Sequence, residues 1–454
     1  MSVKWTEEQQ KVISLRNRSI LVSAAAGSGK TAVLVERILA MLTDKNHPVD
    51  IDRLLIMTFT RAAAGEMRER ITSALESALY EDPDNEHLQR QMNLIHTAQI
   101  TTIDGFCSYV IRNYFHMIGL DPGFRTAEEG EMKLLREDVA KEVLEEAYRE
   151  KTEDFMALTE CYAPGKTDDG LKDLVFRLYD AAMSHPFPEE WLEECLKTFQ
   201  AEDVETLRKE PWMDLLWQTA DEELAQAERL ARRTVRICLL PDGPYLYEEA
   251  LESDLQFIDR VKKAVDSRDY ARTSEILGEL SFARLSGKKQ PEAEEAKKEL
   301  VKELREGEKN ILKELAGKYF RCSEEELLRL QIQCRSPLTG LVDLTRKFRE
   351  TLDRKKREKN LLDFTDMEHF ALEILVKKEG ETFTPTQAAR ELSEKYEEVL
   401  IDEYQDSNYV QEMIAAMVSG WVKNRKNIFM VGDVKQSIYR FRLARPELFM
   451  EKYH

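Results

Sequence analysis

The sequence predicts an α/β fold, in which a parallel sheet is interrupted by a large α-helical insertion. Short apolar runs suited to buried strands stand near both ends of the 454-residue chain, and helical patterns follow the first two of them. Between about Thr126 and Glu358 the pattern changes to long, charge-rich helical periodicities with few strand-like runs. Strands that alternate with helices favour a parallel sheet covered on both faces. We therefore expect three segments: 1–125 and 359–454 as two parts of one domain, and 126–358 as an inserted helical domain.

The first part contains two strand-and-helix units. Residues 19–23 form a short apolar run, a glycine turn follows, and Thr31 to Leu42 has helical spacing of apolar residues. Residues 54–57 give a second buried strand, and an alanine-rich helix is expected from about Arg61 onward.

The strand pattern returns twice after the helical stretch. Residues 399–401 and 428–431 are apolar, and a polar turn follows each of them. Turn-forming and charged residues dominate 286–294 and 353–360, so these two stretches are expected to be the most mobile.

Composition narrows the possible classes of protein. The chain has 67 Lys and Arg against 86 Asp and Glu, a net charge of −19, which argues against a protein that coats nucleic acid by bulk attraction. No apolar run approaches the ~18 residues that span a bilayer, and residues 1–10 do not resemble a secretory signal. We expect no membrane partner and a cytoplasmic protein. The six cysteines show no metal-binding spacing and are expected to be reduced, mostly buried thiols.

A glycine-rich turn between the first strand and helix is a candidate phosphate-binding loop. Backbone N–H groups of such a loop, and the N-terminus of the helix that follows, can cradle phosphates. Lys30 would reach the β- and γ-phosphates and Thr31 would hold Mg²⁺. The loop residues are Ala24, Ala25, Ala26, Gly27, Ser28 and Gly29. The usual pattern begins with glycine where this chain has Ala24, and the alternative is a glycine turn that only packs.

The strand at 399–401 ends in two carboxylates. Asp402 could bind Mg²⁺, usually through water, and Glu403 could polarise an attacking water. Taken alone, this pattern is more often a plain strand end with exposed acids. Paired with a phosphate loop it predicts an ATPase whose cofactors are ATP and Mg²⁺.

Several blocks together resemble the motifs of UvrD-like superfamily 1 DNA helicases. Residues 402–407 (DEYQDS) resemble the DE-x-QD box, 5–9 (WTEEQ) the Q motif, and 58–67 (TFTRAAAGEM) the TFTN-x-AA-x-EM motif. Residues 101–107 (TTIDGFC), 361–366 (LLDFTD) and 432–442 (GDVKQSIYRFR) match further elements in the same order. This order over both ends of the chain implies a RecA-like P-loop motor domain.

The resemblance also implies roles for individual residues. The side-chain amide of Gln9 would read the adenine edge, and Gln436 would sense the γ-phosphate. With Lys30 and Glu403, Gln436 makes up the expected catalytic set.

Single-stranded DNA is the polymer that these helicases bind. The expected contacts are Thr58, Phe59, Thr60, Arg61, Thr102, Asp104, Tyr439, Phe441 and Arg442. An aromatic face stacks on any base and so suits tracking without sequence preference. Phe59 and Phe106 could equally be core aromatics, whereas for Phe441 the DNA contact is favoured. Asp104 stands where many relatives have His, and Arg61 replaces the usual Asn.

Among these helicases the chain is most similar to the AddA branch of helicase-nucleases. The similarity lies in the opening Trp5-Thr6, in residues 24–27 and 120–125, and in the large helical insertion. It implies a role in double-strand-break repair and recombination, DNA single strands and duplex ends as substrate, and an AddB-like partner in a heterodimer.

The family would continue beyond His454 with a second RecA-like domain, whose arginines contact the γ-phosphate, and with a nuclease domain. We therefore expect residues 1–454 alone to bind nucleotide and single-stranded DNA, to hydrolyse ATP poorly and not to unwind duplexes. The alternative is a nucleotide-dependent binding module that never hydrolyses ATP productively and acts through a partner.

Overall fold

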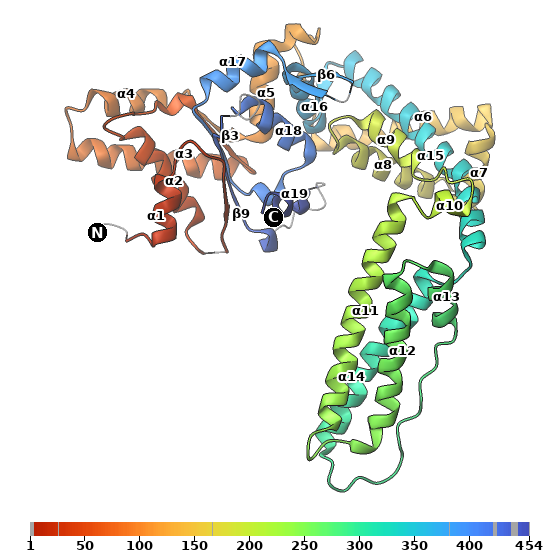
Figure 1. The fold of residues 1–454 in the computed structure, drawn as a ribbon. Helices are drawn as coiled ribbons and strands as arrows, with labels where there is room; N and C mark the ends of the chain where they lie inside the picture. The colour runs from red at the N-terminus through yellow and green to blue at the C-terminus, as the bar shows by residue number, and fades with distance from the viewer. Residues whose placement is uncertain are drawn as a thin grey trace. The chain divides into compact units, whose positions relative to one another are not determined.

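The chain folds into two compact units. The computed structural model describes residues 4–25, 27–165, 167–380, 382–420, 425–436 and 444–453. The sheet unit comprises Met1–Lys151, Gly165–Leu192 and Val342–His454, and the helical unit comprises Thr152–Pro164 and Glu193–Leu341. Figure 1 shows both units, and each is described separately below.

A five-stranded parallel sheet lies at the centre of the sheet unit, which confirms the α/β prediction. Its strand order is β1 (Ile20–Ser23), β9 (Ile428–Gly432), β8 (Glu398–Ile401), β2 (Leu54–Thr58) and β3 (Gln99–Thr102). Four strands lie where the apolar runs predicted them. The sequence analysis did not predict β3, because this edge strand alternates half-buried and buried residues over only QITT and forms no apolar run.

The two faces of the sheet are buried by alternate residues of each strand, as a pleated strand requires. Leu55 and Val399 point into a core shared with α5 (Ile103–Tyr114), α16 (Phe364–Leu375), α17 (Gln387–Lys395) and α18 (Tyr409–Val418). Leu54 and Leu400 point into a second core shared with α2 (Lys30–Leu42), α3 (Arg61–Glu81) and α4 (Glu86–Leu94). Helices therefore cover both faces (Figure 1), as expected for parallel strands with buried runs.

The helices of the sheet unit account for the rest of its regular structure. The α-helices before the insertion are α1 (Glu7–Ser14), α2 (Lys30–Leu42), α3 (Arg61–Glu81), α4 (Glu86–Leu94) and α5 (Ile103–Tyr114). Those after it are α16 (Phe364–Leu375), α17 (Gln387–Lys395), α18 (Tyr409–Val418) and α19 (Pro446–Tyr453). Short 3-10 turns are η1 (Ile51–Arg53), η2 (Phe115–Met117), η5 (Tyr404–Asp406) and η7 (Val434–Gln436), and β6 (Val376–Glu379) pairs with β7 (Thr382–Pro385).

The insertion leaves and rejoins the sheet unit at two paired strands. Strand β4 (Arg125–Thr126) pairs in parallel with β5 (Leu361–Leu362), so the ends of the inserted segment lie side by side. Every strand of the five-stranded sheet comes from outside 126–358.

The helical unit lies inside the expected boundaries at 126 and 358, because it begins at Thr152 and ends at Leu341. Helices α6 (Glu129–Glu150) and α8 (Asp169–Met183) belong to the sheet unit, as does α15 (Glu324–Glu358) from Val342 onward. They pack on one another: Phe348 of α15 contacts the rings of Phe176 and Tyr179 in α8, with centroids 5.4 and 5.2 Å apart. Arg136 of α6 binds Asp180 at 2.8 Å.

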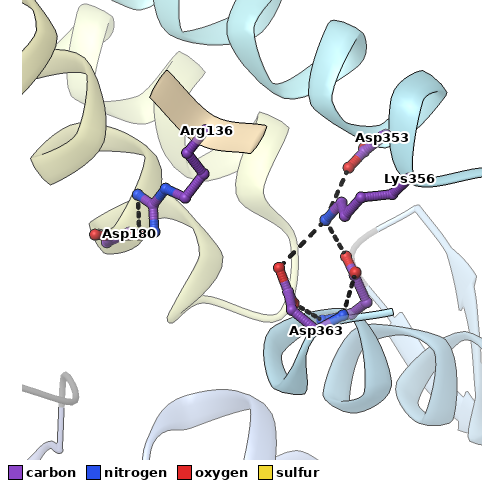
Figure 2. Close-up of polar contacts among 6 residues, drawn as sticks. Arg136, Asp180, Asp353, Lys356 and Asp363 are labelled. Carbon is purple, nitrogen blue, oxygen red and sulfur yellow. Dashed lines mark hydrogen bonds and ion pairs between the residues drawn. The ribbon is translucent and has the colours of Figure 1, made fainter. Parts of the chain in front are cut away.

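A buried lysine fixes the end of α15 and corrects the expectation that 353–360 is a mobile stretch. Residues 353–358 are helical, and the side chain of Lys356 is only 3% exposed. Its ammonium group lies 2.5 Å from Asp366, 3.4 Å from Asp363 and 3.5 Å from Asp353 (Figure 2). The charge of Lys356 is therefore satisfied within the protein, by Asp353 of its own helix and by Asp363 and Asp366 at the start of the next helix, α16, whereas Arg354 and residues 357–360 are exposed.

The helical unit is built around long helices that pack side by side. Helix α11 (Pro211–Cys238) packs against α12 (Glu248–Asp266) and α14 (Glu295–Glu314), as Figure 1 shows. Its remaining elements are α7 (Glu153–Tyr162), α10 (Val204–Leu207), η3 (Tyr245–Tyr247), α13 (Tyr270–Gly278) and the π-helical turn Leu315–Tyr319, while α9 (Pro188–Lys197) and α15 span both units. Trp217, Tyr270 and Phe320 form the aromatic part of its core.

Two further features of the structure concern its helices and its cysteines. Within the described part of the chain, no helix is both long enough and apolar enough to cross a bilayer. All six cysteines are free thiols, but only Cys107 and Cys238 are buried, so the expectation of mostly buried thiols was wrong. Cys161 and Cys334 lie on outward-facing positions of the amphipathic helices α7 and α15, where a small side chain needs no burial.

Candidate functional site

The predicted nucleotide residues meet at the carboxyl edge of the central sheet. Strand β9 lies between β1 and β8, and the register pairs Ser23 with Gly432 and Ile401 with Met430. Because all three strands are parallel, the turns that follow them leave the sheet at the same edge. This edge of an open α/β sheet is where ligands usually bind.

The loop after β1 is shaped by two glycines in the left-handed region. Gly27 has φ of 75° and Gly29 has φ of 81°, conformations that other residues adopt only with strain. Gly29 is the N-cap of α2 and provides no side-chain cap, so the first N–H groups of α2 have no side-chain acceptor there. The N–H of Ala24 donates to the carbonyl of Gly432 at 3.1 Å, which anchors the loop to β9. Ala26 lies outside the described residues.

Gln9 lies against this loop. Its amide nitrogen donates to the carbonyl of Ser28 at 3.2 Å, and its amide oxygen accepts from the N–H of Thr6 at 2.9 Å. Thr6 is the N-cap of α1 and accepts from the N–H of Gln9, so the two residues form a reciprocal capping box. One amide hydrogen and one lone pair of Gln9 stay available for a ligand.

Lys30 is held between the two other turns of the edge. Its ammonium nitrogen lies 3.6 Å from a carboxylate oxygen of Glu403 and donates to Gln436 Oε1 at 3.4 Å. The Lys30 side chain is 10% exposed, whereas that of Glu403 is 38% exposed. The structure therefore brings together all three residues of the expected catalytic set.

Asp402 lies at the end of β8 in a largely buried position. Burial raises its pKa to about 6, the adjacent Glu403 carboxylate adds to the rise, and the N–H of Glu403, which donates at 3.0 Å, opposes it. Glu403 has φ of 53°, an uncommon conformation for a residue other than glycine. Backbone strain of this kind is concentrated at functional sites.

Two further residues hold the edge together, although the sequence analysis gave them no role. Gln405 is 1% exposed, donates to Glu403 Oε2 at 2.8 Å and accepts from the N–H of Asp433 at 2.9 Å. Asp433 in turn accepts from the side chain of Gln436 at 2.6 Å. Both residues lie within the quoted motif blocks, and for Asp433 the signal that could have found it is a polar residue directly after a buried strand.

The close approach of Gln405 also explains why β9 ends in glycine. A Cβ atom on Gly432 would lie 2.1 Å from the side-chain oxygen of Gln405. A larger residue would push this amide away from Glu403.

The residues at this edge fit a nucleotide with Mg²⁺. The loop offers backbone N–H groups at a helix N-terminus. Lys30 offers a positive charge whose carboxylate partner, Glu403, lies 3.6 Å away. Thr31, half-buried in the first turn of α2, and Asp402 supply the oxygen ligands that Mg²⁺ prefers.

The DNA-binding residues expected at the end of β2 include both buried and exposed side chains. Thr58 is 1% exposed and its hydroxyl donates to the carbonyl of Thr60 at 3.1 Å. Phe59 is half-buried, and Thr60 and Arg61 are exposed at the start of α3, where Thr60 accepts from the N–H of Ala63.

Strand β3 places its two expected residues beside those of β2. Thr102 pairs in register with Thr58 and caps α5 by accepting from the N–H of Gly105 at 3.0 Å. Asp104 is half-buried in the first turn of α5. Burial raises the pKa of Glu368 to about 7, and the negative charge of Asp104 adds to the rise. Phe106 is fully buried against Tyr396, which settles it as a core aromatic.

The remaining expected DNA residues, Tyr439, Phe441 and Arg442, lie outside the described residues. The described part of the predicted DNA surface is therefore the edge formed by the ends of β2 and β3.

The chain is similar in sequence to known proteins. The family model described as UvrD/REP helicase N-terminal domain matches residues 5–454. The chain is 51% identical over 451 residues to the ATP-dependent helicase/nuclease protein AddA of Lachnoclostridium phytofermentans, a match that covers 99% of this chain and 33% of that protein.

Two further relatives bear the same name. The protein from Clostridium perfringens strain ATCC 13124 is 43% identical over 464 residues, covering 100% of this chain and 36% of the relative. The protein from Geobacillus kaustophilus is 42% identical over 453 residues, covering 99% of this chain and 36% of the relative. The chain thus spans about a third of the length of the curated relatives it matches.

Proposed function

The chain belongs to the UvrD/REP helicase family, and from this membership we propose that its sheet unit is an ATP-binding DNA helicase motor domain. One observation carries the proposal: Lys30, Glu403 and Gln436 come from three separate turns, and Lys30 contacts both of the others at one sheet edge. A lysine at a glycine-rich helix N-terminus beside a carboxylate pair is the arrangement that phosphoryl transfer uses.

Each residue of the edge has a separate task in this proposal. The N–H groups of the loop and the ammonium group of Lys30 bind phosphate oxygens. Thr31 and Asp402 hold Mg²⁺, which when bound supplies positive charge beside the phosphates. The Glu403 carboxylate orients and polarises water, and Gln405 keeps that carboxylate in place through its 2.8 Å hydrogen bond.

The pairing of Lys30 with Glu403 gives the site a way to respond to nucleotide. Phosphate oxygens compete with Glu403 for the ammonium group, and the long 3.6 Å pair is easily exchanged. Glu403 is then released for water, while Gln436, fixed by Asp433, stays beside Lys30 and can report phosphate to the turn that follows β9.

We also propose that single-stranded DNA lies along the ends of β2 and β3. Thr60 and Arg61 are exposed there and can bind phosphates, while half-buried Phe59 can meet a base. The hydroxyl of Thr58 donates to the carbonyl of Thr60 and that of Thr102 caps α5, so we assign these two buried residues a positioning role instead of direct contact.

For the whole protein we propose an ATP-dependent helicase-nuclease that acts on DNA ends in double-strand-break repair with an AddB-like partner. This proposal rests on the name that the relatives share, which describes an ATP-dependent helicase/nuclease, and on identities of 42 to 51% across this chain.

Calorimetric titration tests the nucleotide site. Lys30→Ala should weaken binding of a non-hydrolysable ATP analogue with Mg²⁺ by at least about tenfold, because a charge-assisted bond to phosphate is lost. Lys45→Ala is the matched control, since Lys45 is an exposed lysine in the turn that follows α2. Equal affinity in wild type and Lys30→Ala contradicts the assignment.

A further inference from the structure

Three rings that no motif includes stack on one another in the sheet unit. His185 lies in the turn between α8 and α9, Trp191 in α9 and Tyr409 at the first position of α18. The His185 ring lies 4.7 Å from that of Trp191 at 17°, and 5.1 Å from that of Tyr409 at 27°. All three residues are half-buried, so part of this aromatic column faces solvent.

A cation accompanies the column. The guanidinium carbon of Arg445 lies 5.6 Å from the centroid of the Tyr409 ring, and the N–H of Arg445 donates to the carbonyl of Ser407 at 2.9 Å. Arg445 Nε and His185 Nε2 are both buried, and neither has a hydrogen-bond partner among the described residues. Buried polar atoms normally have partners, so the polar groups beside the column are not fully satisfied within the described residues.

The column is neutral apart from this arginine. Burial lowers the pKa of His185 to about 4, and the nearby charge of Arg445 lowers it further, so the imidazole is uncharged near neutral pH. The group therefore presents uncharged aromatic faces beside a single positive charge.

We propose that the aromatic column and Arg445 form a second contact for single-stranded DNA, in which a base stacks on the rings and a phosphate accepts from Arg445. Stacking on aromatic faces combined with cations along the backbone is how proteins bind single strands without sequence preference. The inference rests on the proposed function, because it extends the DNA path beyond the ends of β2 and β3.

The position of the column supports this occupant. Tyr409 follows the Asp402–Ser407 block that leaves the carboxyl edge of β8, and Ser407 in that block holds the backbone of Arg445. A DNA strand bound here would thus contact the polypeptide segment that also carries Asp402 and Glu403. An acidic peptide could pair with Arg445 as well, but three parallel rings match a nucleobase better than a peptide side chain.

Fluorescence anisotropy with a labelled oligothymidylate tests the site in the 454-residue chain. Trp191→Ala should weaken binding about fivefold or more, the loss expected when a stacked base loses its ring, while Trp191→Phe should retain most of the affinity. Arg445→Gln should reduce the slope of log affinity against log salt by about 0.7, the value for one phosphate contact to a single strand.

Matched controls separate a lost contact from a general change. Arg112→Gln removes another guanidinium that lies over a ring, 5.1 Å from Phe124 in the same unit, and should leave the salt slope unchanged. Tyr80→Ala removes a ring that is 89% exposed on α3 and should leave affinity unchanged. Thermal unfolding of every variant shows whether the fold is kept.

Photo-cross-linking with 5-iododeoxyuridine oligonucleotides, followed by mass spectrometry, locates the contact. Cross-links at Trp191 or Tyr409 support the proposal. Unchanged binding by Trp191→Ala and Arg445→Gln, with cross-links only near Phe59, overturns the column and leaves the proposed function standing. A wild-type chain that binds no single-stranded DNA contradicts the proposed DNA function itself and the column with it.

Discussion

Helix α2 and strand β8 are joined by two pairs of opposite charge, one at each end of the strand, and the two pairs differ in nearly every physical respect. At the amino end Arg37 binds Glu398 through two hydrogen bonds, one of them 3.0 Å long, and the side chains are 0% and 7% exposed. Arg37 also donates to the carbonyl of Val12 and lies over the ring of Phe429. At the carboxyl end Lys30 meets Glu403 once, at 3.6 Å.

The difference teaches which pair is structural and which is functional. Every partner of Arg37 is fixed within the protein, so nothing there is available to a ligand. Lys30 is a flexible point charge with a weak partner, which a phosphate can replace. The same helix and strand therefore carry a fixed joint at one end and an exchangeable contact at the other.

The largest effect is expected from breaking the fixed joint. Arg37→Ala should lower the free energy of unfolding by about 3–5 kcal/mol, because it leaves the Glu398 carboxylate buried without its partner. Urea denaturation measures this loss. Lys30→Ala is the matched variant and should change the free energy of unfolding by less than about 1 kcal/mol, since its pair is long and partly exposed. Similar losses in both variants would remove the distinction.

A second prediction sharpens the functional end through pH. Because burial and the adjacent Glu403 raise the pKa of Asp402 to about 6, only about a tenth of this carboxyl is ionised at pH 5. Mg²⁺-dependent nucleotide affinity should therefore fall about tenfold as pH drops from 7.5 to 5. Titrations with a fluorescent analogue across this range measure it.

Asp402→Asn serves as the control for this pH dependence. Any dependence that the variant retains belongs to the nucleotide, and the difference from wild type belongs to Asp402. The effect of pH on stability has the opposite sign to its effect on nucleotide affinity. The pKa of Asp402 in the folded protein exceeds its ordinary value of 3.8, so its contribution to stability is present at low pH and is lost as pH rises through about 6. A wild-type profile parallel to that of Asp402→Asn would refute the role of this carboxylate.

The smallest effect is expected at the exchangeable contact itself. Glu403→Gln should change the free energy of unfolding by less than about 1 kcal/mol, because an exposed ion pair contributes little. Nucleotide affinity should be kept or slightly increased, since Lys30 no longer has a competing carboxylate. Chemical denaturation and calorimetry on the same preparation check both statements, and a clear loss of affinity would show that Glu403 binds nucleotide directly.

The sequence analysis assigned roles to both residues of the functional pair, Lys30 and Glu403, but to neither residue of the structural pair, Arg37 and Glu398. Gly27, Gly29 and Lys30 can be recognised in the sequence because their spacing is typical of phosphate binding. The apolar runs before Ala24 and before Asp402 place the phosphate loop and the acidic pair at strand ends. Arg37 and Glu398 are 361 residues apart and look like ordinary surface charges on a helix and before a strand. Only the order of the strands in the sheet brings them together, and the sequence patterns do not reveal that order.

The same limit applies elsewhere in the sheet unit. The charged run at 353–360 suggested mobility because nothing local shows that Lys356 is surrounded by Asp353, Asp363 and Asp366. Strand β3 was missed because its burial comes from pairing with β2 and not from an apolar run. The column of His185, Trp191 and Tyr409 was invisible for the same reason, since two of its rings lie more than 200 residues before the third.

Hydrogen–deuterium exchange with and without a non-hydrolysable ATP analogue and Mg²⁺ tests the central claim most directly. Nucleotide should slow exchange in 27–31, 402–405 and 432–436, the three turns at the carboxyl edge, and should leave 34–40 and 396–399 at the fixed joint unchanged. Protection confined to other segments, or no protection at saturating nucleotide, would contradict the account.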